Sequence, residues 1–343
     1  MTANNSAERV LGVAFGFEAA RAVQAAVLIG IFDLLSGSGR SALSVARATQ
    51  AKPESTAILL DALSGLGLLR KISGCYSNAP DAARHLVSRS PDSLCDLILH
   101  AAFRFAEWER LPDAVRTGKP VRPHDMFQHR REETQAFIRG MHNLAVARGD
   151  ALALPRLVNL SSARNLVDIG GGPATYAIHL CKAYPKLTVT VLDHPGSLEV
   201  ARGYVARSRL QKRITLKKTD ILKDSLGGPY DAALLSNILH GERAATNRRL
   251  LKKIHGALTP GATLIVKDHL MNRTLTRPGG GALFALTMLM YTRGRCYGLH
   301  EIRGWLAEAG FTRGVKRRVP GTSAVAILVS RKHSTQIRSG RHR

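Results

Sequence analysis

The sequence is short of acidic residues, cysteine and aromatics, and it has no long uncharged hydrophobic run. Its 343 residues include 25 Asp and Glu against 50 Lys and Arg, four Cys, and 5% aromatics. The longest uncharged stretch, residues 278–292, is shorter than the roughly 18 to 20 residues that a membrane helix needs. The first ten residues, MTANNSAERV, lack a basic segment followed by an apolar core, so no signal peptide is expected. We therefore predict no membrane insertion and a cytoplasmic location.

The four cysteines are scattered along the chain and form no CxxC pair. This spacing excludes a disulfide framework and a cysteine zinc site, and it indicates free thiols in a reducing compartment. We expect no bound metal. The residues are Cys75, Cys95, Cys181 and Cys296.

The formal net charge of +25 is the one unusual number in the composition. A field of this sign attracts polyanions and anionic surfaces without specifying any of them. The last residues, RKHSTQIRSGRHR, carry five Lys or Arg and no acid, and no aromatic follows Phe311. Nucleic-acid contacts usually interleave aromatics with basic residues, so we expect residues 333–343 to form a disordered basic tail.

The first part of the chain reads as helical. AARAVQAAVLIGIFDLL and ESTAILLDALSGLGLL place apolar residues at three- and four-residue spacing, and the Ser73-Gly74 pair that follows predicts the turn of a small hairpin. Three helices followed by a hairpin are typical of a winged helix. We predict a winged-helix-like domain over residues 1–100 and further helices over residues 101–160.

From about residue 161 the pattern changes to short apolar strands that alternate with helical segments, which predicts an α/β fold with a doubly wound, mostly parallel sheet. The boundary is expected between residues 150 and 163, near Pro155, and this domain is expected to end at residue 332. The predicted strands are NLVDI, TVTVLD, RITLKKTD, YDAALLSN, ATLIVKDH and SAVAILVS.

Consecutive glycines follow the first of these strands, in LVDIGGGPATYAIHL. A strand, a tight turn and a helix start together present backbone N–H groups beside a positive helix end, and glycine lets a ligand approach the backbone. The spacing Gly170-x-Gly172-x-x-Thr175 lacks the third small residue of a nicotinamide fingerprint. Alone, the turn predicts either a ligand site or a merely tight connection.

Acidic residues end the next two strands. Asp193 closes TVTVLD, where a carboxylate can accept both ribose hydroxyls of a nucleoside cofactor or, alternatively, cap a helix. Asp220, followed by Ile221, closes KKTDIL within reach of an adenine amino group. Glycine, acid and acid at three adjacent strand ends predict a nucleoside pocket without separating dinucleotides from S-adenosylmethionine.

His240 follows the strand DAALLSNIL and precedes a helix. A neutral imidazole at that sheet edge can take a proton from a hydroxyl that attacks an electrophile, although the same residue could simply cap the helix. Asp268 ends the strand TLIVKD and could hold the imidazole tautomer, hold substrate, or be only structural.

Together these residues resemble the S-adenosylmethionine-dependent small-molecule O-methyltransferases of the caffeate, hydroxyindole and polyketide-tailoring type. LVDIGGGPATY resembles the cofactor loop of that family, VLDHP its ribose segment, TDIL its adenine segment, and LLSNILHGERAATNRRLLKKI the stretch that carries its catalytic histidine. The front of the chain, with LIGIFDLL and WERLPDAVRTG, resembles the family's dimerisation domain. The likeness covers nearly the whole chain.

The resemblance implies S-adenosylmethionine bound over Gly170 and Gly172, with its ribose on Asp193 and its adenine beside Asp220 and Ile221. His240 would deprotonate a hydroxyl of a small aromatic or polyketide-like substrate, and the chain would form a homodimer through its N-terminal domain. The segment GGGALFALTMLMY would line the substrate pocket through Phe284, Met288, Met290 and Tyr291, which are equally compatible with ordinary core.

The sequence departs from the family pattern at several places. Gly241 and Glu242 follow the histidine where the family usually has an acidic and then an aromatic residue, and Ala174 stands where a glycine is frequent. Ser236 replaces a basic cofactor contact of plant members, and Cys296 replaces a second carboxylate beside the histidine. These changes leave cofactor binding largely untouched and weaken the picture of a base supported by two acids.

Other functions remain open at this stage. A relative of the same fold could methylate a carbon of an enolisable or macrocyclic molecule. An RNA methyltransferase is disfavoured, because SNILHG replaces the Asn/Asp-Pro-Pro-aromatic motif of base-amino enzymes. A winged-helix DNA-binding protein is also disfavoured, since the charged residues of ESTAILLDALSGLGLL are Glu54 and Asp61, both acidic.

Overall fold

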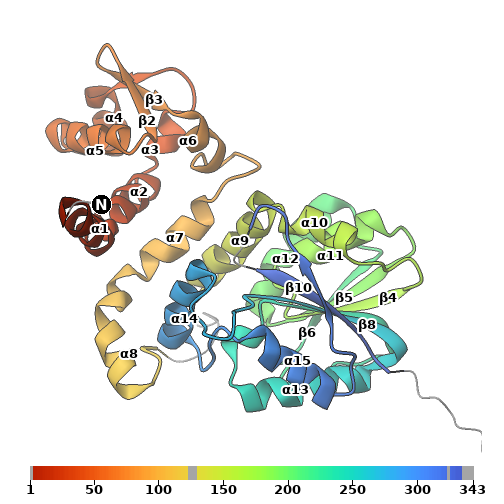
Figure 1. The fold of residues 1–343 in the computed structure, drawn as a ribbon. Helices are drawn as coiled ribbons and strands as arrows, with labels where there is room; N and C mark the ends of the chain where they lie inside the picture. The colour runs from red at the N-terminus through yellow and green to blue at the C-terminus, as the bar shows by residue number, and fades with distance from the viewer. Residues whose placement is uncertain (1–2, 123–129, 323–324, 334–343) are drawn as a thin grey trace, which may run out of the picture. The chain divides into compact units, whose positions relative to one another are not determined.

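The computed structural model describes residues 3–122, 130–322 and 325–333. The chain divides into two compact units, residues 1–106 and residues 107–343 (Figure 1). Apart from residue 333, the expected basic tail lies outside the described residues.

The first unit consists of helices around a small antiparallel sheet. In the hairpin β2 (Leu69–Ile72) and β3 (Cys75–Asn78), the turn residues Ser73 and Gly74 have φ of 48° and 77°. Positive φ at both positions is typical of a two-residue hairpin turn, so the predicted turn is confirmed. The short strand β1 (Arg40–Ser41) pairs with β3. The helices are α1 (Ala3–Ala14), α2 (Gly16–Leu28), α3 (Ile31–Leu34), α4 (Ala42–Thr49), α5 (Pro53–Gly65), α6 (Pro80–His85) and α7 (Cys95–Phe103).

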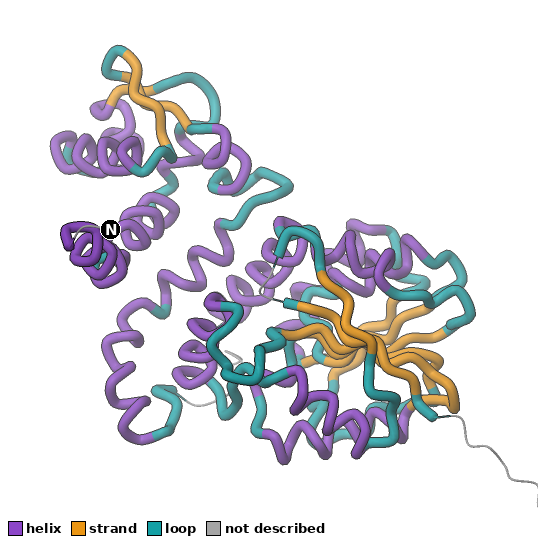
Figure 2. The backbone as a smooth tube through the Cα atoms, viewed as in Figure 1, coloured by secondary structure: helices purple, strands orange, loops and turns teal. Residues whose placement is uncertain are grey.

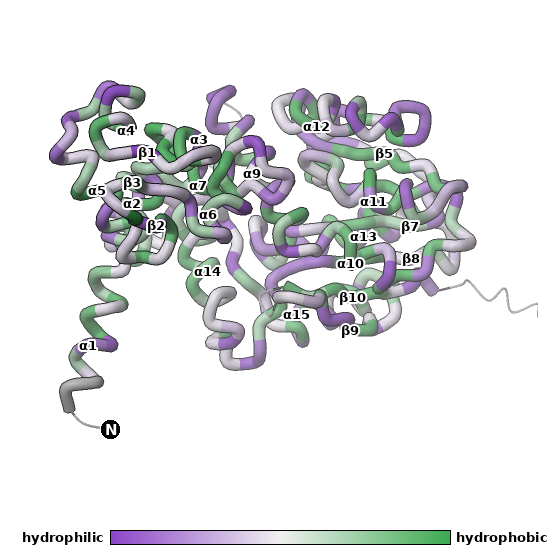
Figure 3. Tube along the Cα trace, turned by 90° about the horizontal axis from the view of Figure 1, so that it is seen from above, coloured by the Kyte–Doolittle hydropathy of each residue, from purple (hydrophilic) through white to green (hydrophobic). Residues whose placement is uncertain are grey.

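The start of this unit exposes apolar side chains. By length and composition alone, the helical stretch Ser6–Leu28 is the one described segment that could cross a membrane, and only 6% of its most apolar window is buried. This stretch contains no long uncharged run, because Glu8, Arg9, Glu18 and Arg21 interrupt it. Figure 3 shows hydrophobic residues along α1. The exposed large residues are Val10, Leu11, Val13, Phe15 and Phe17.

The second unit is built on a seven-stranded sheet of order β6-β5-β4-β7-β8-β10-β9. The first five strands in this order are parallel to one another, and β10 pairs antiparallel with both of its neighbours, β8 and β9. This arrangement confirms the predicted doubly wound, mostly parallel sheet (Figure 2). The strands are β4 (Asn165–Ile169), β5 (Thr188–Asp193), β6 (Ile214–Lys218), β7 (Tyr230–Ser236), β8 (Leu258–Asp268), β9 (Val315–Arg318) and β10 (Ala326–Arg331).

Two apolar clusters cover the two faces of this sheet. Leu166, Leu234 and Ile265 belong to the cluster that includes α10 and α11, whereas Val167 and Leu235 belong to the cluster that includes α13 and α15. This alternation follows from the two-residue period of a strand. In Figure 1, α10, α11 and α12 lie on one face and α13 and α15 on the other. The helices are α8 (Leu111–Thr117), α9 (Arg131–Ala147), α10 (Asp150–Leu157), α11 (Thr175–Ala183), α12 (Pro195–Ser208), α13 (Ala244–Ala257), α14 (Gly279–Tyr291) and α15 (Leu299–Glu308).

Pro155, near which the domain boundary is predicted, lies inside α10. The edge strand β9 was not predicted, because all four of its residues are exposed and three are basic. Charged residues of this kind protect a sheet edge from pairing with other chains.

Candidate active site

The glycine turn lies at the point where the strand order of the sheet reverses. β4 lies at the centre, with β5 and β6 on one side and β7 and β8 on the other. Open α/β sheets bind ligands in the crevice at such a switch point. The residues that follow β4 and β7 therefore meet at one edge.

Each glycine of the turn is required for a different reason. Gly170 and Gly172 have φ of 67° and 53°, a region in which other residues are strained. A Cβ on Gly171 would lie 2.7 Å from Cγ of Asp168, and one on Gly170 would lie 2.4 Å from Cδ1 of Ile238. Nothing lies within 4 Å of a Cβ on Gly172. The turn thus leaves open space over Gly172 beside the start of α11.

Ala174 adopts a backbone conformation that favours glycine. It is the N-cap of α11 with φ of 60°, in the left-handed region. An L residue with a Cβ pays roughly 1–2 kcal/mol for this conformation. The departure affects the backbone and leaves the open side of the turn unchanged.

Asp193 ties β5 to the glycine turn. Its Oδ2 accepts the backbone N–H of Gly172 at 2.7 Å, and its Oδ1 accepts the N–H of His194 at 2.6 Å. Burial raises the pKa of this carboxyl, and the two N–H donors only partly offset the shift. Each oxygen retains acceptor capacity, as a ribose diol would require.

Asp168 is a functional candidate that the sequence analysis passed over. It is fully buried, and neither of its carboxylate oxygens has a hydrogen-bond partner among the described residues. Burial, and to a smaller degree the charge of Asp193, raises the pKa of Asp168 to about 7. Buried polar groups are nearly always paired, so this one calls for a donor or cation from a ligand. The sequence signal is an acid that interrupts an apolar strand two residues before the glycines.

Asp220 is largely engaged by its own turn. Its Oδ1 accepts the N–H groups of Leu222 and Lys223 at 3.0 and 3.3 Å, and its Oδ2 lies 3.1 Å from Nζ of Lys223. Burial opposes ionisation, but these donors lower the pKa of Asp220 below its usual value. Ile221 lies over the turn, with Cδ1 3.8 Å from a Cβ placed on Gly170. The structure brings Ile221 to the expected pocket and gives Asp220 a local structural role.

His240 and Asp268 come together at the ends of neighbouring strands. Nδ1 of His240, in the 3-10 turn η2 (Leu239–Gly241), lies 2.6 Å from Oδ1 of Asp268. Burial opposes ionisation of Asp268, but His240 lowers its pKa. An ionised carboxylate needs a donor, so the proton is assigned to Nδ1 and Nε2 is left as the acceptor. The alternative that His240 caps the next helix is wrong, because the N-cap of α13 is Arg243.

Aromatic rings surround the imidazole. Phe284 of α14 meets the His240 ring edge-on at 5.0 Å and stacks on His269 at 4.3 Å. Burial lowers the pKa of His269 to about 4, so this unpredicted neighbour is neutral at pH 7. Of the other expected lining residues, Met290 and Tyr291 pack with Ala114 of α8 and Met288 is buried. These three are buried, and Phe284 contacts the ring of His240.

Cys296 does not supply a second acid. It is buried, and this burial together with the charge of Asp268 raises the pKa of its thiol to about 12. Asp268 is therefore the one carboxylate on the imidazole among the described residues, as the sequence departure implied.

A buried cation lies beside Ser236 on the neighbouring strand. Lys267 of β8 is in register with Ser236, and its Nζ lies 3.0 Å from Oδ2 of Asp150. It also lies over the Tyr176 ring at 5.3 Å. A buried basic group is thus present one strand away from Ser236, and Asp150 balances its charge.

These residues fit a nucleoside cofactor that also carries a cationic group. The cradle over Gly172 admits a ligand against the backbone, Asp193 can accept a diol, and the orphaned oxygens of Asp168 can accept from an ammonium. In the described part of the chain no group of three or more His, Cys, Asp or Glu is arranged to hold a metal ion.

Comparison with known proteins identifies the family. The O-methyltransferase domain matches residues 108–312, and the O-methyltransferase dimerisation domain matches residues 11–88. The chain is 31% identical over 325 residues to the 3-hydroxy-5-methyl-1-naphthoate 3-O-methyltransferase of Streptomyces sahachiroi, covering 92% of this chain and 93% of the relative. It is also 31% identical over 334 residues to the acetylserotonin O-methyltransferase of Mus musculus molossinus, covering 91% and 85%.

The fold is shared with a solved enzyme. The crystal structure of human N-acetylserotonin methyltransferase in complex with SAM superposes with a TM-score of 0.88 at 24% identity, covering 97% of this chain and all of the other. Other solved neighbours include one described with SAH. The sequence matches and the shared fold lead to one conclusion: the chain belongs to the S-adenosylmethionine-dependent O-methyltransferase family.

Proposed function

We propose that the enzyme transfers a methyl group to a hydroxyl of a small aromatic or polyketide-like molecule, with His240 as the general base. The observation that supports this role is the 2.6 Å contact between Nδ1 of His240 and Oδ1 of Asp268. An ionised Asp268 would accept a hydrogen bond from Nδ1 and so favour the tautomer whose Nε2 can accept a proton.

The residues at the ends of β4 and β5 would hold the cofactor. Asp193 would accept the ribose hydroxyls, Asp168 the ammonium of the amino-acid part, and Ile221 would pack near the base. Asp220 would contribute only its remaining acceptor capacity toward the adenine amino group. Bound S-adenosylmethionine supplies a methyl group that is already electrophilic, so the protein has to supply position and a proton acceptor.

His240 would move one proton. The substrate hydroxyl donates to Nε2, which takes the proton as the oxygen attacks, and the imidazolium that results is stabilised by Asp268. Phe284 and neutral His269 would exclude water from the ring without adding charge. The balance of charge rests on Asp268 alone, since Cys296 keeps its proton.

The substrate class follows from the relatives. One methylates the 3-hydroxyl of a hydroxymethylnaphthoate and another acts on acetylserotonin. We infer a hydroxyl on a fused aromatic or similar small molecule. A carbon acceptor on an enolisable molecule stays the alternative, because the same imidazole can remove a proton from carbon.

The first unit would serve dimerisation. Residues 11–88 match the dimerisation domain, and the exposed Val13, Phe15 and Phe17 would be covered by a second copy. We infer a winged-helix-like fold and a homodimer in the cytoplasm. A nucleic-acid role has no support in α5, whose Asp61 is held by Lys71 and Tyr76 at 2.6 and 2.8 Å.

Two variants test the proposal. His240→Ala should slow single-turnover methylation of a hydroxynaphthalene by roughly 10² to 10⁴ and leave S-adenosylmethionine affinity unchanged in calorimetry. Asp193→Ala should abolish that affinity. Near-normal rates in the first variant would remove His240 as the base, and intact binding in the second would refute the ribose contact.

A further inference from the structure

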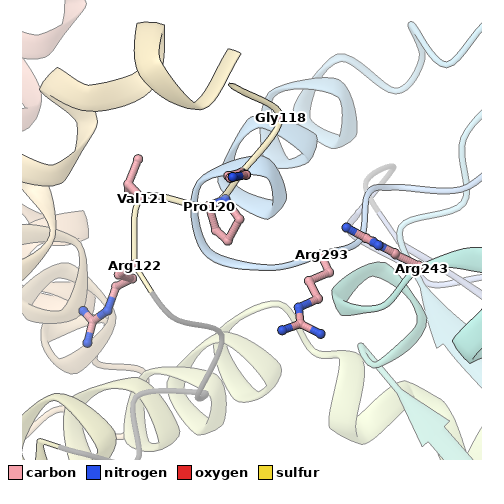
Figure 4. Close-up of a pocket in the computed structure, with 7 residues that line it drawn as sticks. Gly118, Pro120, Val121, Arg122, Arg243 and Arg293 are labelled. Atoms are coloured by element: carbon pink, nitrogen blue, oxygen red, sulfur yellow. The ribbon is translucent and has the colours of Figure 1, made fainter. Parts of the chain in front are cut away.

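A basic pocket of about 650 Å³ lies in the second unit, within the size range of small-ligand sites. Four of its lining residues, Lys119, Arg122, Arg243 and Arg293, are basic, and no described lining residue is acidic. Gly118, Pro120 and Val121 complete the described lining (Figure 4).

The pocket is built on the same framework as His240. Arg243 is three residues beyond the histidine and begins α13. Arg293 precedes Gly294, which is pressed so close to the loop that a Cβ there would lie 2.1 Å from the His240 carbonyl oxygen. The N–H of Val121 donates to the carbonyl of Met290 at 2.9 Å. This hydrogen bond attaches the lining segment 118–122 to the end of α14.

The helix α14 connects the pocket to the imidazole. Phe284 contacts the His240 ring, and α14 ends at Tyr291, two residues before Arg293. Seven residues of helix span about 10 Å. That is the length of a small fused aromatic molecule with its substituents.

The charges of the pocket are only partly balanced. Arg122 is held by Glu107 and Glu133 at 3.1 and 3.0 Å. In the described parts of the chain, Arg243 and Arg293 have no carboxylate within 4 Å. Figure 4 shows Arg243 and Arg293 approaching the pocket from the side opposite Val121 and Arg122.

The start of α13 adds to this positive field. Its N-cap is the basic Arg243, and its first turn contains no acidic residue. Helix N-termini favour negative charge, so a cation at this position is unfavourable unless an anion lies beside it. Two exposed guanidinium groups and a helix end thus converge on one cavity.

We propose that this pocket binds an anionic group, a carboxylate or a phosphate or sulfate ester, carried by the methyl acceptor. Arg293 and Arg243 pair with its oxygens while the hydroxyl of the same molecule faces His240. The acceptor is then a hydroxylated aromatic acid, and the inference rests on the proposed function for the identity of the reaction. Guanidinium groups suit this role because their planar N–H forks match carboxylate and phosphate oxygens.

The test uses two probes that differ only in the presence of a carboxylate group. Binding of 3-hydroxy-1-naphthoate and of 2-naphthol is measured by calorimetry on the full-length protein with saturating S-adenosylhomocysteine. The naphthoate should bind at least about tenfold more tightly, and Arg293→Gln and Arg243→Gln should each weaken it about tenfold without changing the binding of 2-naphthol. Arg249 is an exposed arginine of α13 that donates to Oγ1 of Thr246 at 3.3 Å. Arg249→Gln removes the same charge outside the pocket and should change the binding of neither probe.

Competition with inorganic phosphate tests whether the pocket binds the anionic group of the acceptor or a free anion. Competition with the naphthoate but not with 2-naphthol supports a shared anion subsite. Equal affinity for the two probes, an equal loss in Arg249→Gln, or no naphthoate binding overturns the proposal. A preference for free phosphate that Arg293→Gln abolishes, with no preference for the naphthoate, also overturns it.

Methyl transfer is measured separately so that the two proposals fail in different ways. The naphthoate could bind in an arginine-dependent way and yet not be methylated at any concentration of S-adenosylmethionine. That result would overturn the proposed function and retain the anion subsite. If both probes are methylated and neither arginine variant changes their binding, the anion subsite is overturned and the proposed function is retained.

Discussion

Asp168 near the end of β4 and Asp268 at the end of β8 are both buried carboxylates at the carboxyl ends of strands of one sheet, with 0% and 2% exposure. Burial raises the pKa of Asp168 to about 7, whereas His240 holds the pKa of Asp268 below its ordinary value. The difference lies in the partner. The fold supplies one to Asp268, and Asp168 has none among the described residues.

This comparison separates two tasks of the site. In the proposed mechanism, the carboxylate paired within the chain would be pre-organised for proton transfer, and the unpaired one would receive a ligand that brings its own donor. Keeping the unpaired group buried costs stability in the ligand-free enzyme, and such costs are typical of functional positions.

The largest expected effect is that of Asp268→Asn on the transfer rate. An amide can donate to Nδ1 of His240 and would leave the proton on Nε2, where the base must accept. We expect single-turnover rates to fall by roughly 10² to 10⁴, as for carboxylate-to-amide changes beside other catalytic histidines. Cofactor affinity should be retained, and Glu308→Gln, on the exposed face of α15, is the control. A rate within threefold of the wild type would contradict the role of Asp268.

Asp168→Asn should change the affinity for the cofactor, whereas Asp268→Asn should change the transfer rate. We expect cofactor affinity to fall by about 10- to 100-fold in calorimetry, because a charge-assisted hydrogen bond becomes a neutral one. The ligand-free variant should unfold at the same or a higher denaturant concentration, because an orphaned carboxylate has been removed. Lower stability with unchanged affinity would show that Asp168 has a hidden partner in the fold.

The pH dependence of cofactor binding further distinguishes the unpaired Asp168 from the paired Asp268. The pKa of Asp168 is raised from 3.8 to about 7 in the folded chain, so its contribution to stability is full below pH 4 and is lost as the pH rises toward 7. A ligand ammonium needs the ionised carboxylate. Affinity should therefore increase with pH below 7, by up to about tenfold per unit, and level off above it. The slope should disappear in Asp168→Asn.

The smallest expected effect is that of Gly172→Ala. Nothing lies within 4 Å of the added Cβ, so only the positive φ of 53° is penalised, and the free energy of unfolding should fall by about 1 kcal/mol. Gly171→Ala should cost more, because its Cβ would lie 2.7 Å from Cγ of Asp168. Chemical denaturation of both variants measures the difference. Equal decreases in the free energy of unfolding would mean that the side chain of Asp168 can move to accommodate the added Cβ.

The architecture was predictable because the spacing of apolar residues along the chain indicates each strand and helix locally. Alternating strands and helices, the Ser73-Gly74 hairpin and the glycine turn all follow from residue spacing. The unpredicted elements have weak local signals: β9 has no apolar alternation, and His269 follows a strand as an ordinary residue. Asp168 interrupts an apolar strand in the sequence, and only its environment shows that it is unpaired among the described residues.

The sequence by itself determined which residue types stand at the strand ends, because the switch from a two-residue to a 3.6-residue period marks each end locally. Only the tertiary structure decided which of them meet. His240 and Asp268 are 28 positions apart, and Arg243 and Arg293 reach one cavity from different segments. Such meetings depend on strand order and register, which are set by burial of the whole sheet and which no local pattern encodes.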